Sequence, residues 1–350
     1  MILRDCWYMA DWAEKLMTGE VLGVTILDEP IALYRKKDGS PSALADRCAH
    51  RLAPLSIGRV EGDDVRCLYH GLKFGPDGQC TELPGQAVIP SAVCVPGYPV
   101  AERHGALWIW MGEAERADLS LIPAIIGPDE SGWAVLTGTM DFKAHATLIG
   151  DNLLDLSHAP WVHQATFASG NEKTVHSMKK GEADTRMDKI ERGVFLQRWQ
   201  LDRPTNPFVE IGHTDDYVVN YFLAPGIFIL KNRCFTPGVQ TRQGSDREPD
   251  EEPILMRSTC QMITPIDAHR SKFFYTFGLW SKHADHAAHA FEVATKAFHE
   301  DKFFIEEQQA MMDRCPDVKV MNLNMDAPLL RYRGVLRGLI EAEREQIGLS

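Results

Sequence analysis

Two short segments, each with one cysteine and one histidine, place the strongest constraint on what this chain can fold into. The first contains Cys48 and His50, the second contains Cys67 and His70, and together they read C-x-H-x16-C-x-x-H. Four such side chains can bind a structural zinc ion or a Rieske-type [2Fe–2S] cluster. Zinc sites usually group two cysteines together and two histidines together. One cysteine and one histidine in each segment instead favours a cluster with both thiolates on one iron and both imidazoles on the other.

The residues around these segments strengthen the cluster interpretation. Pro54 and Gly58 follow the first segment, and Gly71 follows the second. Proline and glycine are the residues that tight loops require. With these neighbours, the pattern resembles the Rieske domain of Rieske-type non-heme iron oxygenases. The matching residues are Cys48, His50, Arg51, Ala53, Pro54, Leu55, Ser56, Gly58, Cys67, Tyr69, His70, Gly71, Leu72 and Phe74.

A second group of metal-binding residues follows in DNLLDLSHAPWVH, residues 151–163. Asp155 and His158 are three residues apart, so they would share one face of a helix. On an unbroken helix His163 would point about 140° away from His158. Pro160 disfavours helical continuation, so we expect the chain to turn and bring His163 back to the same centre. Two histidines and one carboxylate form the facial triad of non-heme iron(II) oxygenases. The alternative is a helix start with two surface histidines.

The same segment resembles the mononuclear iron motif of the Rieske oxygenases. The resemblance implies that His158 and His163 bind iron, and that Asn152 lies close to it. It also implies that Asp155 connects the iron to the Rieske cluster of a neighbouring subunit. The family pattern E-D-x4-E-x-x-Q falls on a later helix and makes Asp301 the iron carboxylate; it covers Glu300, Asp301, Glu306 and Gln309.

The order of strand-like and helix-like segments predicts an α+β chain. Residues 1–115 are expected to form an all-β Rieske [2Fe–2S] domain, with a turn at 37–40 and a strand at 105–112. Residues 116–132, rich in acids, prolines and glycines, are expected to link it to a catalytic domain over 133–350. There we expect an antiparallel sheet with flanking helices, the clearest of them at 285–314 and 328–346.

Composition excludes some classes of function. The net charge is −12, with 37 basic and 49 acidic residues, which argues against general binding to nucleic acids or anionic membranes. No apolar run approaches the length of a membrane span, and the N-terminal residues do not resemble a secretion signal. We therefore expect a cytoplasmic protein. Six further cysteines show no ligand spacing and are expected to be buried thiols: Cys6, Cys80, Cys94, Cys234, Cys260 and Cys315.

No dinucleotide-binding fingerprint is present, so electrons are expected to come from a separate reductase. Within the family, residues 7–16, 22–35 and 318–344 resemble the vanillate O-demethylase branch. This resemblance implies a homotrimeric terminal oxygenase that acts on a substituted aromatic acid. The expected reaction is O-demethylation of an aryl methyl ether with release of formaldehyde. An aromatic-ring dioxygenase or another C–H hydroxylase is the alternative within the family, and a Rieske electron carrier is the alternative of another class.

The residues that contact substrate are less well defined by the sequence. Polar residues of the catalytic domain that could lie in a pocket are Arg198, Asn220, Lys231, Asn232 and Gln261. Gln261 belongs to a predicted strand over 257–265, and we expect it to line the pocket.

Overall fold

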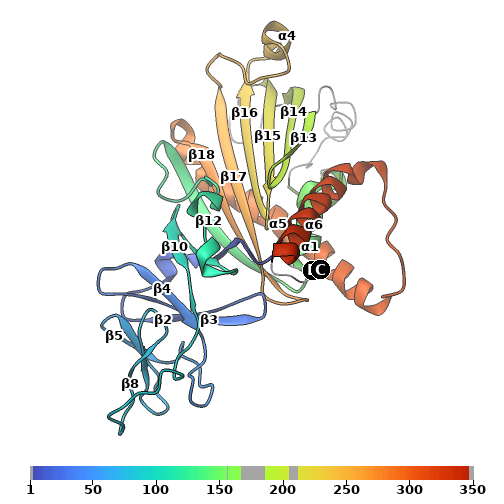
Figure 1. Cartoon of the computed structure of the whole chain (residues 1–350). Coiled ribbons are helices and arrows are strands. Elements are labelled where there is room, and N and C mark those ends of the chain that lie inside the picture. The colour runs from blue at the N-terminus through green and yellow to red at the C-terminus, as the bar shows by residue number, and fades with distance from the viewer. Residues whose placement is uncertain (1–2, 156, 167–185, 205–211, 347–350) are drawn as a thin grey trace. The chain divides into compact units, whose positions relative to one another are not determined.

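The computed structural model describes residues 3–155, 157–166, 186–204 and 212–346. The chain forms two units. Unit 1 contains the chain up to Ala124 together with Thr264–Asp267, and unit 2 contains Ile125–Ile263 and the chain from Ala268 onward. Figure 1 colours both by residue number.

Unit 1 consists of short strands and three single-turn 3-10 helices. Its three sheets have the strand orders β1-β11-β10, β2-β3-β4-β9 and β5-β6-β7-β8. The strands are β1 (Trp7–Trp12), β2 (Val21–Ile26), β3 (Glu29–Arg35), β4 (Pro41–Ala45), β5 (Arg59–Glu61), β6 (Asp64–Arg66), β7 (Lys73–Phe74), β8 (Cys80–Glu82), β9 (Gly97–Tyr98), β10 (Val100–Arg103) and β11 (Ala106–Trp110). The 3-10 helices are η1 (Ala13–Lys15), η2 (Ala114–Arg116) and η3 (Leu119–Leu121).

The predicted turn at residues 37–40 connects β3 to β4, as expected from its Asp-Gly pair. A second, tighter turn was missed. Leu27 and Asp28 both have positive φ angles, 53° and 65°, and reverse the chain between β2 and β3. Neither residue is glycine, so the usual sequence signal for such a turn is absent.

Unit 2 is built on a seven-stranded sheet with the order β12-β18-β17-β16-β15-β14-β13. Figure 1 shows α1, α5 and α6 together on one face of this sheet. The strands are β12 (Trp133–Phe142), β13 (Arg186–Ile190), β14 (Gly193–Pro204), β15 (His213–Leu223), β16 (Ile227–Phe235), β17 (Leu255–Pro265) and β18 (Ser271–Trp280). The helices are α1 (Ala146–Leu154), α2 (Ala159–Val162), α4 (Val239–Gln243), α5 (Ala287–Arg314) and α6 (Ala327–Gln346), with 3-10 turns η4 (Ser281–His286) and η5 (Asn324–Asp326).

Apolar side chains of the sheet pack against these helices. Val194, Phe222 and Phe228 come from neighbouring strands, and α1 and α5 contribute residues such as Leu148 and Ile305 to the same buried cluster. The adjacent pairs from β13 to β17, and the pair β12–β18, are antiparallel. The predicted fold class, all-β followed by α+β with an antiparallel sheet and flanking helices, is confirmed.

The expectation that six cysteines are buried is correct for four of them. Cys6, Cys80, Cys234 and Cys260 are buried, whereas Cys94 and Cys315 are exposed. Cys94 lies outside the named strands and forms an isolated β-bridge with Gln79, and Cys315 is the C-cap of α5. Positions in a loop and at a helix end are reached by solvent, and the spacing of cysteines does not reveal this.

Candidate metal centres

The first cysteine loop of unit 1 is closed by its own backbone. The Cys48 N–H donates to the Ala53 carbonyl over 2.8 Å, and the Leu52 N–H donates to the Cys48 carbonyl over 3.0 Å. Leu52 has a φ of 57°, a left-handed conformation that is unusual for a branched side chain. His50 lies inside the loop, two residues after the cysteine.

The second cysteine loop repeats this arrangement. The Cys67 N–H donates to the Leu72 carbonyl over 2.8 Å, and the Gly71 N–H donates to the Cys67 carbonyl over 3.0 Å. Gly71 has a φ of 79° and occupies the position that corresponds to Leu52. His70 is the third residue after the cysteine, so the histidines differ in position while the backbones agree.

The four side chains separate into an inner and an outer pair. The thiols of Cys48 and Cys67 are buried, with 2% and 1% of each residue exposed. Burial, together with the neighbouring Cys67 thiol, raises the pKa of Cys48. The His50 and His70 rings are exposed and lie with their centroids 4.5 Å apart.

This spacing distinguishes a cluster from a single zinc ion. Within the part of the chain that the structure describes, His158, His163 and Asp301 are the one group of three donors within 4.8 Å. No three of the four Rieske-loop side chains are that close, although a single ion would need them to be. Paired thiols on the inside and paired imidazoles on the outside fit a [2Fe–2S] cluster held by both loops.

Polar side chains hold each loop from outside. Asp46 accepts hydrogen bonds from the backbone N–H and the hydroxyl of Ser56, both 2.6 Å long. Arg66 donates to the Gly71 carbonyl over 2.6 Å and pairs with Glu61. Hydrogen bonds from Arg66 and Arg59 lower the pKa of Glu61 to about 2. Charged side chains therefore support the backbone of both loops.

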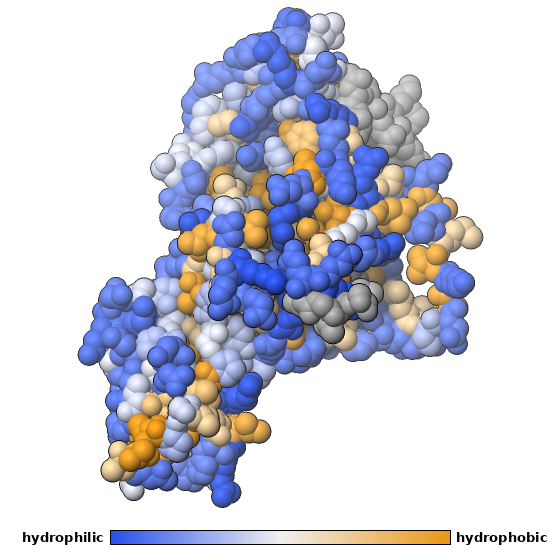
Figure 2. All heavy atoms as spheres, in the orientation of Figure 1, coloured by the Kyte–Doolittle hydropathy of each residue, from blue (hydrophilic) through white to orange (hydrophobic). Residues whose placement is uncertain are grey.

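Both loops also expose apolar side chains beside the histidines. Leu52 is 69% exposed, Leu68 is 55% exposed and Tyr69 is 63% exposed. Figure 2 shows apolar atoms at the end of unit 1 that carries β5 and β8.

In unit 2, the histidine segment is two short helices instead of one. Helix α1 ends at Leu154, and Asp155 caps it with its N–H on the Asp151 and Asn152 carbonyls. Helix α2 begins after its N-cap, His158. The prediction that Asp155 and His158 share one helix face is therefore wrong.

The break also lies ahead of Pro160, which is at the start of α2. Proline is well accommodated in a first turn, where the missing N–H costs nothing, so it begins the second helix instead of ending the first. The Asp155 carboxylate accepts hydrogen bonds from the Ser157 N–H and hydroxyl, which stabilises the turn between the helices.

The resulting geometry brings three donor atoms together. The His158 and His163 Nε2 atoms are each 3.3 Å from Asp301 Oδ1, and the two Nε2 atoms are 3.3 Å apart. His163 and Asp301 are buried, with 4% and 6% exposed. Two imidazoles and one carboxylate at this spacing can hold one divalent iron ion and leave further coordination positions open.

The far nitrogens of both imidazoles are also fixed. His158 Nδ1 donates to the Asp155 carbonyl, and His163 Nδ1 lies 2.9 Å from Glu300 Oε2. Such bonds orient each ring with Nε2 toward the metal. Burial lowers the pKa of His158, but the hydrogen bond and charge of Asp301 and the Asp155 carbonyl outweigh it, so the pKa is raised. The site therefore favours positive charge.

Contacts from α1 and α5 support Asp301. Asn152 Nδ2 donates to Asp301 Oδ1 over 3.2 Å. One turn or two further along α5, Glu306 accepts from the Lys143 N–H and Gln309 accepts from the His145 N–H. In the E-D-x4-E-x-x-Q pattern, Asp301 thus faces the metal site. The other three residues accept hydrogen bonds from nearby parts of the chain: Glu300, Glu306 and Gln309. The role of Glu300 against His163 was not predicted, because the sequence shows only an acidic helix face.

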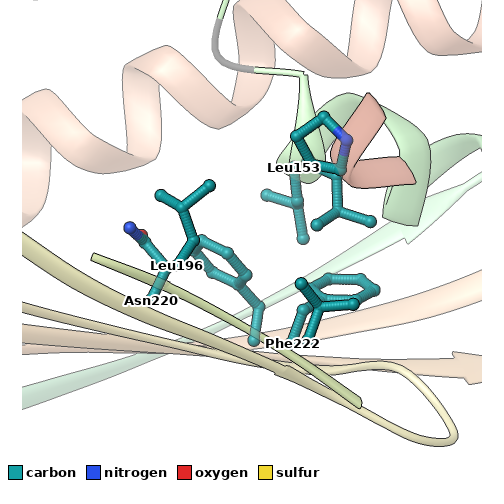
Figure 3. Close-up of a pocket in the computed structure, with 8 residues that line it drawn as sticks. Leu153, Leu196, Asn220 and Phe222 are labelled. Carbon is teal, nitrogen blue, oxygen red and sulfur yellow. The ribbon is translucent and has the colours of Figure 1, made fainter. Parts of the chain in front are cut away.

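A small apolar pocket lies in unit 2 between the sheet and α1 (Figure 3). Its lining residues are Leu153, Leu154, Val194, Leu196, Asn220, Phe222, Phe228 and Pro328. Leu153 and Leu154 directly follow Asn152 in the chain. Gln261 is buried on β17 and donates to Thr259 over 3.1 Å, but it is not one of the lining residues. Of the five polar candidates from the sequence, Asn220 lines this pocket.

A cluster-binding unit followed by a His/His/Asp site defines an oxygenase that combines a Rieske centre with non-heme iron. The Rieske [2Fe–2S] domain family matches residues 6–99, and the vanillate O-demethylase oxygenase C-terminal domain family matches residues 142–342. The chain belongs to the Rieske non-heme iron oxygenases with a C-terminal domain of this type. Its cofactors are a Rieske [2Fe–2S] cluster and a mononuclear non-heme iron, and it is an oxidoreductase that incorporates molecular oxygen.

Several named proteins are similar to this chain over almost its whole length. The iron–sulfur subunit of a toluene-4-sulfonate monooxygenase system from Comamonas testosteroni is 33% identical over 350 residues, covering 98% of both chains. A vanillate O-demethylase oxygenase subunit from Pseudomonas sp. is 28% identical and covers 99% of this chain and 97% of its own. Dicamba monooxygenase bound to dicamba has the same fold, with a TM-score of 0.80, 24% identity and 98% of each chain covered. No helix among the described residues is long and apolar enough to cross a membrane.

Proposed function

We propose that this chain is a terminal oxygenase that oxidises a substituted aromatic acid with O2 and electrons from a separate reductase. The favoured reaction is O-demethylation of an aryl methyl ether. In this reaction the ether, O2, two electrons and two protons give a phenol, formaldehyde and water. The observation that carries the proposal is the convergence of two Nε2 atoms and one carboxylate oxygen within 3.3 Å of each other. Vanillate O-demethylase and dicamba O-demethylase relatives support the choice of reaction.

The proposed roles follow from the geometry. We assign the cluster ligands as Cys48, His50, Cys67 and His70, the iron ligands as His158, His163 and Asp301, the near-iron residue as Asn152 and the electron relay as Asp155. Bound cluster and iron supply single electrons and a site for O2, respectively. The protein holds both imidazoles by their Nδ1 atoms and holds the carboxylate through Asn152. The apolar pocket beside α1 keeps water from the substrate. Gln261 remains a predicted substrate contact.

Electron transfer to the iron is proposed to cross between subunits of a homotrimer, as the family resemblance implies. Asp155 supports this because it lies beside exposed groups. Met325 is 52% exposed, and the Ser157 hydroxyl contacts both its Sδ and the Asp155 carboxylate; Trp161, in the following helix α2, is 65% exposed. Exposed apolar side chains of this size suit a covered surface. None of the eight cysteines, all of them within the described residues, forms a disulfide, which suits the cytoplasmic location proposed here.

Another C–H hydroxylation is the second candidate, and the toluene-4-sulfonate monooxygenase relative favours it. Ring dioxygenation is a third possibility within the family. A Rieske electron carrier is the alternative from a different class, but its function requires only the cluster and does not explain the His/His/Asp site. Iron quantitation separates the classes, since an oxygenase binds three irons per chain and a carrier binds the two of its cluster.

A turnover assay tests the proposed reaction. Iron-loaded protein receives electrons from a surrogate reductase, together with O2 and a panel of methoxylated and unmethoxylated aromatic acids. Formaldehyde formed one-to-one with a phenol supports O-demethylation. A hydroxylated product without formaldehyde supports the second candidate, C–H hydroxylation, and a diol supports ring dioxygenation.

A further inference from the structure

The amide of Asn220 is buried in the apolar pocket without a hydrogen-bond partner. Asn220 lies on β15, where it pairs with Leu196 of β14 and Leu230 of β16. Only 4% of the residue is exposed. Within the described part of the chain, neither Nδ2 nor Oδ1 has a hydrogen-bond partner. An unpaired buried amide is unfavourable for folding, so this side chain is better explained by a ligand than by stability.

The remainder of the pocket is apolar. Figure 3 shows Asn220 at one end, Phe222 on the sheet side and Leu153 on the opposite side. The seven other lining residues are leucine, valine, phenylalanine and proline, and none carries a charge. The enclosed part of this space is only about 10 Å³, room for about one water, and the region amounts to about 300 Å³ only when its open mouth and the adjoining solvent are counted. An aromatic ring therefore enters through the mouth and requires the lining side chains to move apart.

The unpaired amide offers an NH2 group as donor and a carbonyl oxygen as acceptor, side by side. Nδ2 can donate to an oxygen of the ligand, while Oδ1 needs an N–H or O–H from it. A carboxylate or sulfonate satisfies only the first of these and places its negative charge against Oδ1. No lining cation offsets the loss of water around such an anion. The pocket thus disfavours an ionised group and favours an uncharged one that both donates and accepts.

We propose that Asn220 determines substrate specificity by binding an uncharged ring substituent that is both a donor and an acceptor, such as a phenolic hydroxyl or a carboxamide. This inference rests on the proposed function and sharpens it, because it places the carboxylate of an aromatic acid outside this pocket. The reacting side of the ring lies toward α1, where Asn152 bonds to Asp301 and the next two residues line the pocket.

Three probes with the same ring test the proposal. They are 3-methoxybenzoate, 3,4-dimethoxybenzoate and 4-hydroxy-3-methoxybenzoate, whose 4-substituent offers respectively no polar group, an acceptor only, and both a donor and an acceptor. Dissociation constants are measured by calorimetry on the iron-loaded enzyme without reductase or O2. We expect the hydroxyl probe to bind at least about tenfold more tightly than the unsubstituted probe, with the dimethoxy probe between them or weaker. In Asn220→Leu this preference falls below about twofold.

Val194→Ala is the matched control, because it removes apolar wall and leaves the amide in place. We expect this variant to weaken the binding of all three probes by a similar factor and to preserve the ratios of their dissociation constants. A wild-type ratio near one, a ratio unchanged in Asn220→Leu, or no binding at millimolar concentration overturns the proposal. Since binding needs no turnover, absence of formaldehyde in the assay above would count against demethylation and leave this result intact.

The thermal stability of Asn220→Leu gives a second readout that does not depend on the probes. Removing an unpaired buried amide should raise the unfolding temperature of the ligand-free enzyme. A clear decrease shows that the amide holds the fold together, and the specificity role is then wrong.

Discussion

The cysteine loops of unit 1 and the iron site of unit 2 differ in how far apart their residues lie along the chain. The two loops start at Cys48 and Cys67 and are closed by hydrogen bonds within five residues. The iron site depends on contacts across the fold. Asn152 and Asp301 are 149 residues apart, and His163 and Glu300 are 137 apart. One centre is thus a local motif, and the other requires the sheet and helices of unit 2 to be packed first.

The centres also differ in how they face solvent. The histidines of the cluster loops are exposed, whereas His163 and Asp301 are buried. An exposed imidazole edge suits a centre that must exchange electrons with a partner, and a buried site suits chemistry that water would disturb. The comparison predicts that changes at the iron site abolish activity with the cluster intact, and that changes at the loops act mainly through stability.

The largest effect is expected from Asp301→Ala. The substitution removes the carboxylate that faces both Nε2 atoms, so the mononuclear iron should be lost and turnover should fall by at least about a hundredfold. Iron content should drop from three to two per chain, while the visible spectrum of the cluster stays unchanged. Glu307→Ala, an exposed acid on the same helix, is the control and should behave as wild type. Retention of three irons in Asp301→Ala would show that another side chain completes the site.

Glu300 should have the next largest effect, because it orients His163 without being one of the three converging donors. Glu300→Leu removes the acceptor for the His163 Nδ1 proton, and we expect iron affinity to fall about 10–100-fold. Glu300→Gln keeps a carbonyl oxygen at the same place and should recover most of the loss. Iron affinity is measured by titration of metal-depleted protein. Equal losses in both variants would mean that the negative charge matters and the orientation of the ring does not.

Sequence reasoning worked best where structure is local. The strand predicted over 105–112 and the helices α5 and α6 were all predicted close to their observed bounds. Their signals are short-range: glycines and prolines in loops, and periodic apolar residues in helices. The turn at Leu27 and Asp28 was missed because neither residue is the expected glycine.

Prediction was weaker where a residue acts through distant neighbours. Asp301 was selected among several acids only through the family pattern, and spacing alone could not have separated it from Glu300 or Glu306. Asn220 was one of five polar candidates, and the sheet register that places it among apolar side chains does not follow from the sequence. The break after α1 was expected at Pro160, but an Asp155 carboxylate that bonds to Ser157 places it earlier.

The pair Gly71 and Leu52 tests whether the two cysteine loops are as similar as their hydrogen bonds indicate. Gly71→Ala places a side chain at a φ of 79°, which costs about 1–2 kcal/mol. The added Cβ would lie 3.0 Å from Pro84 Cγ, so the neighbour must also shift. We expect the temperature at which the cluster absorbance is lost to fall by several degrees. An unchanged midpoint would mean that the loop relaxes without strain.

Leu52→Gly is the reverse change at the corresponding position, and its effect should be the smallest. Relief of the left-handed conformation is worth about 1–2 kcal/mol, while the greater freedom of glycine in the unfolded chain costs about 0.5–1 kcal/mol. Little apolar burial is lost, because the side chain is 69% exposed. The midpoint of cluster loss should therefore stay level or rise slightly, opposite in direction to Gly71→Ala. A decrease as large as that of Gly71→Ala would show that the Leu52 side chain holds the first loop in a way that has no counterpart in the second, and the two loops would then be alike in backbone only.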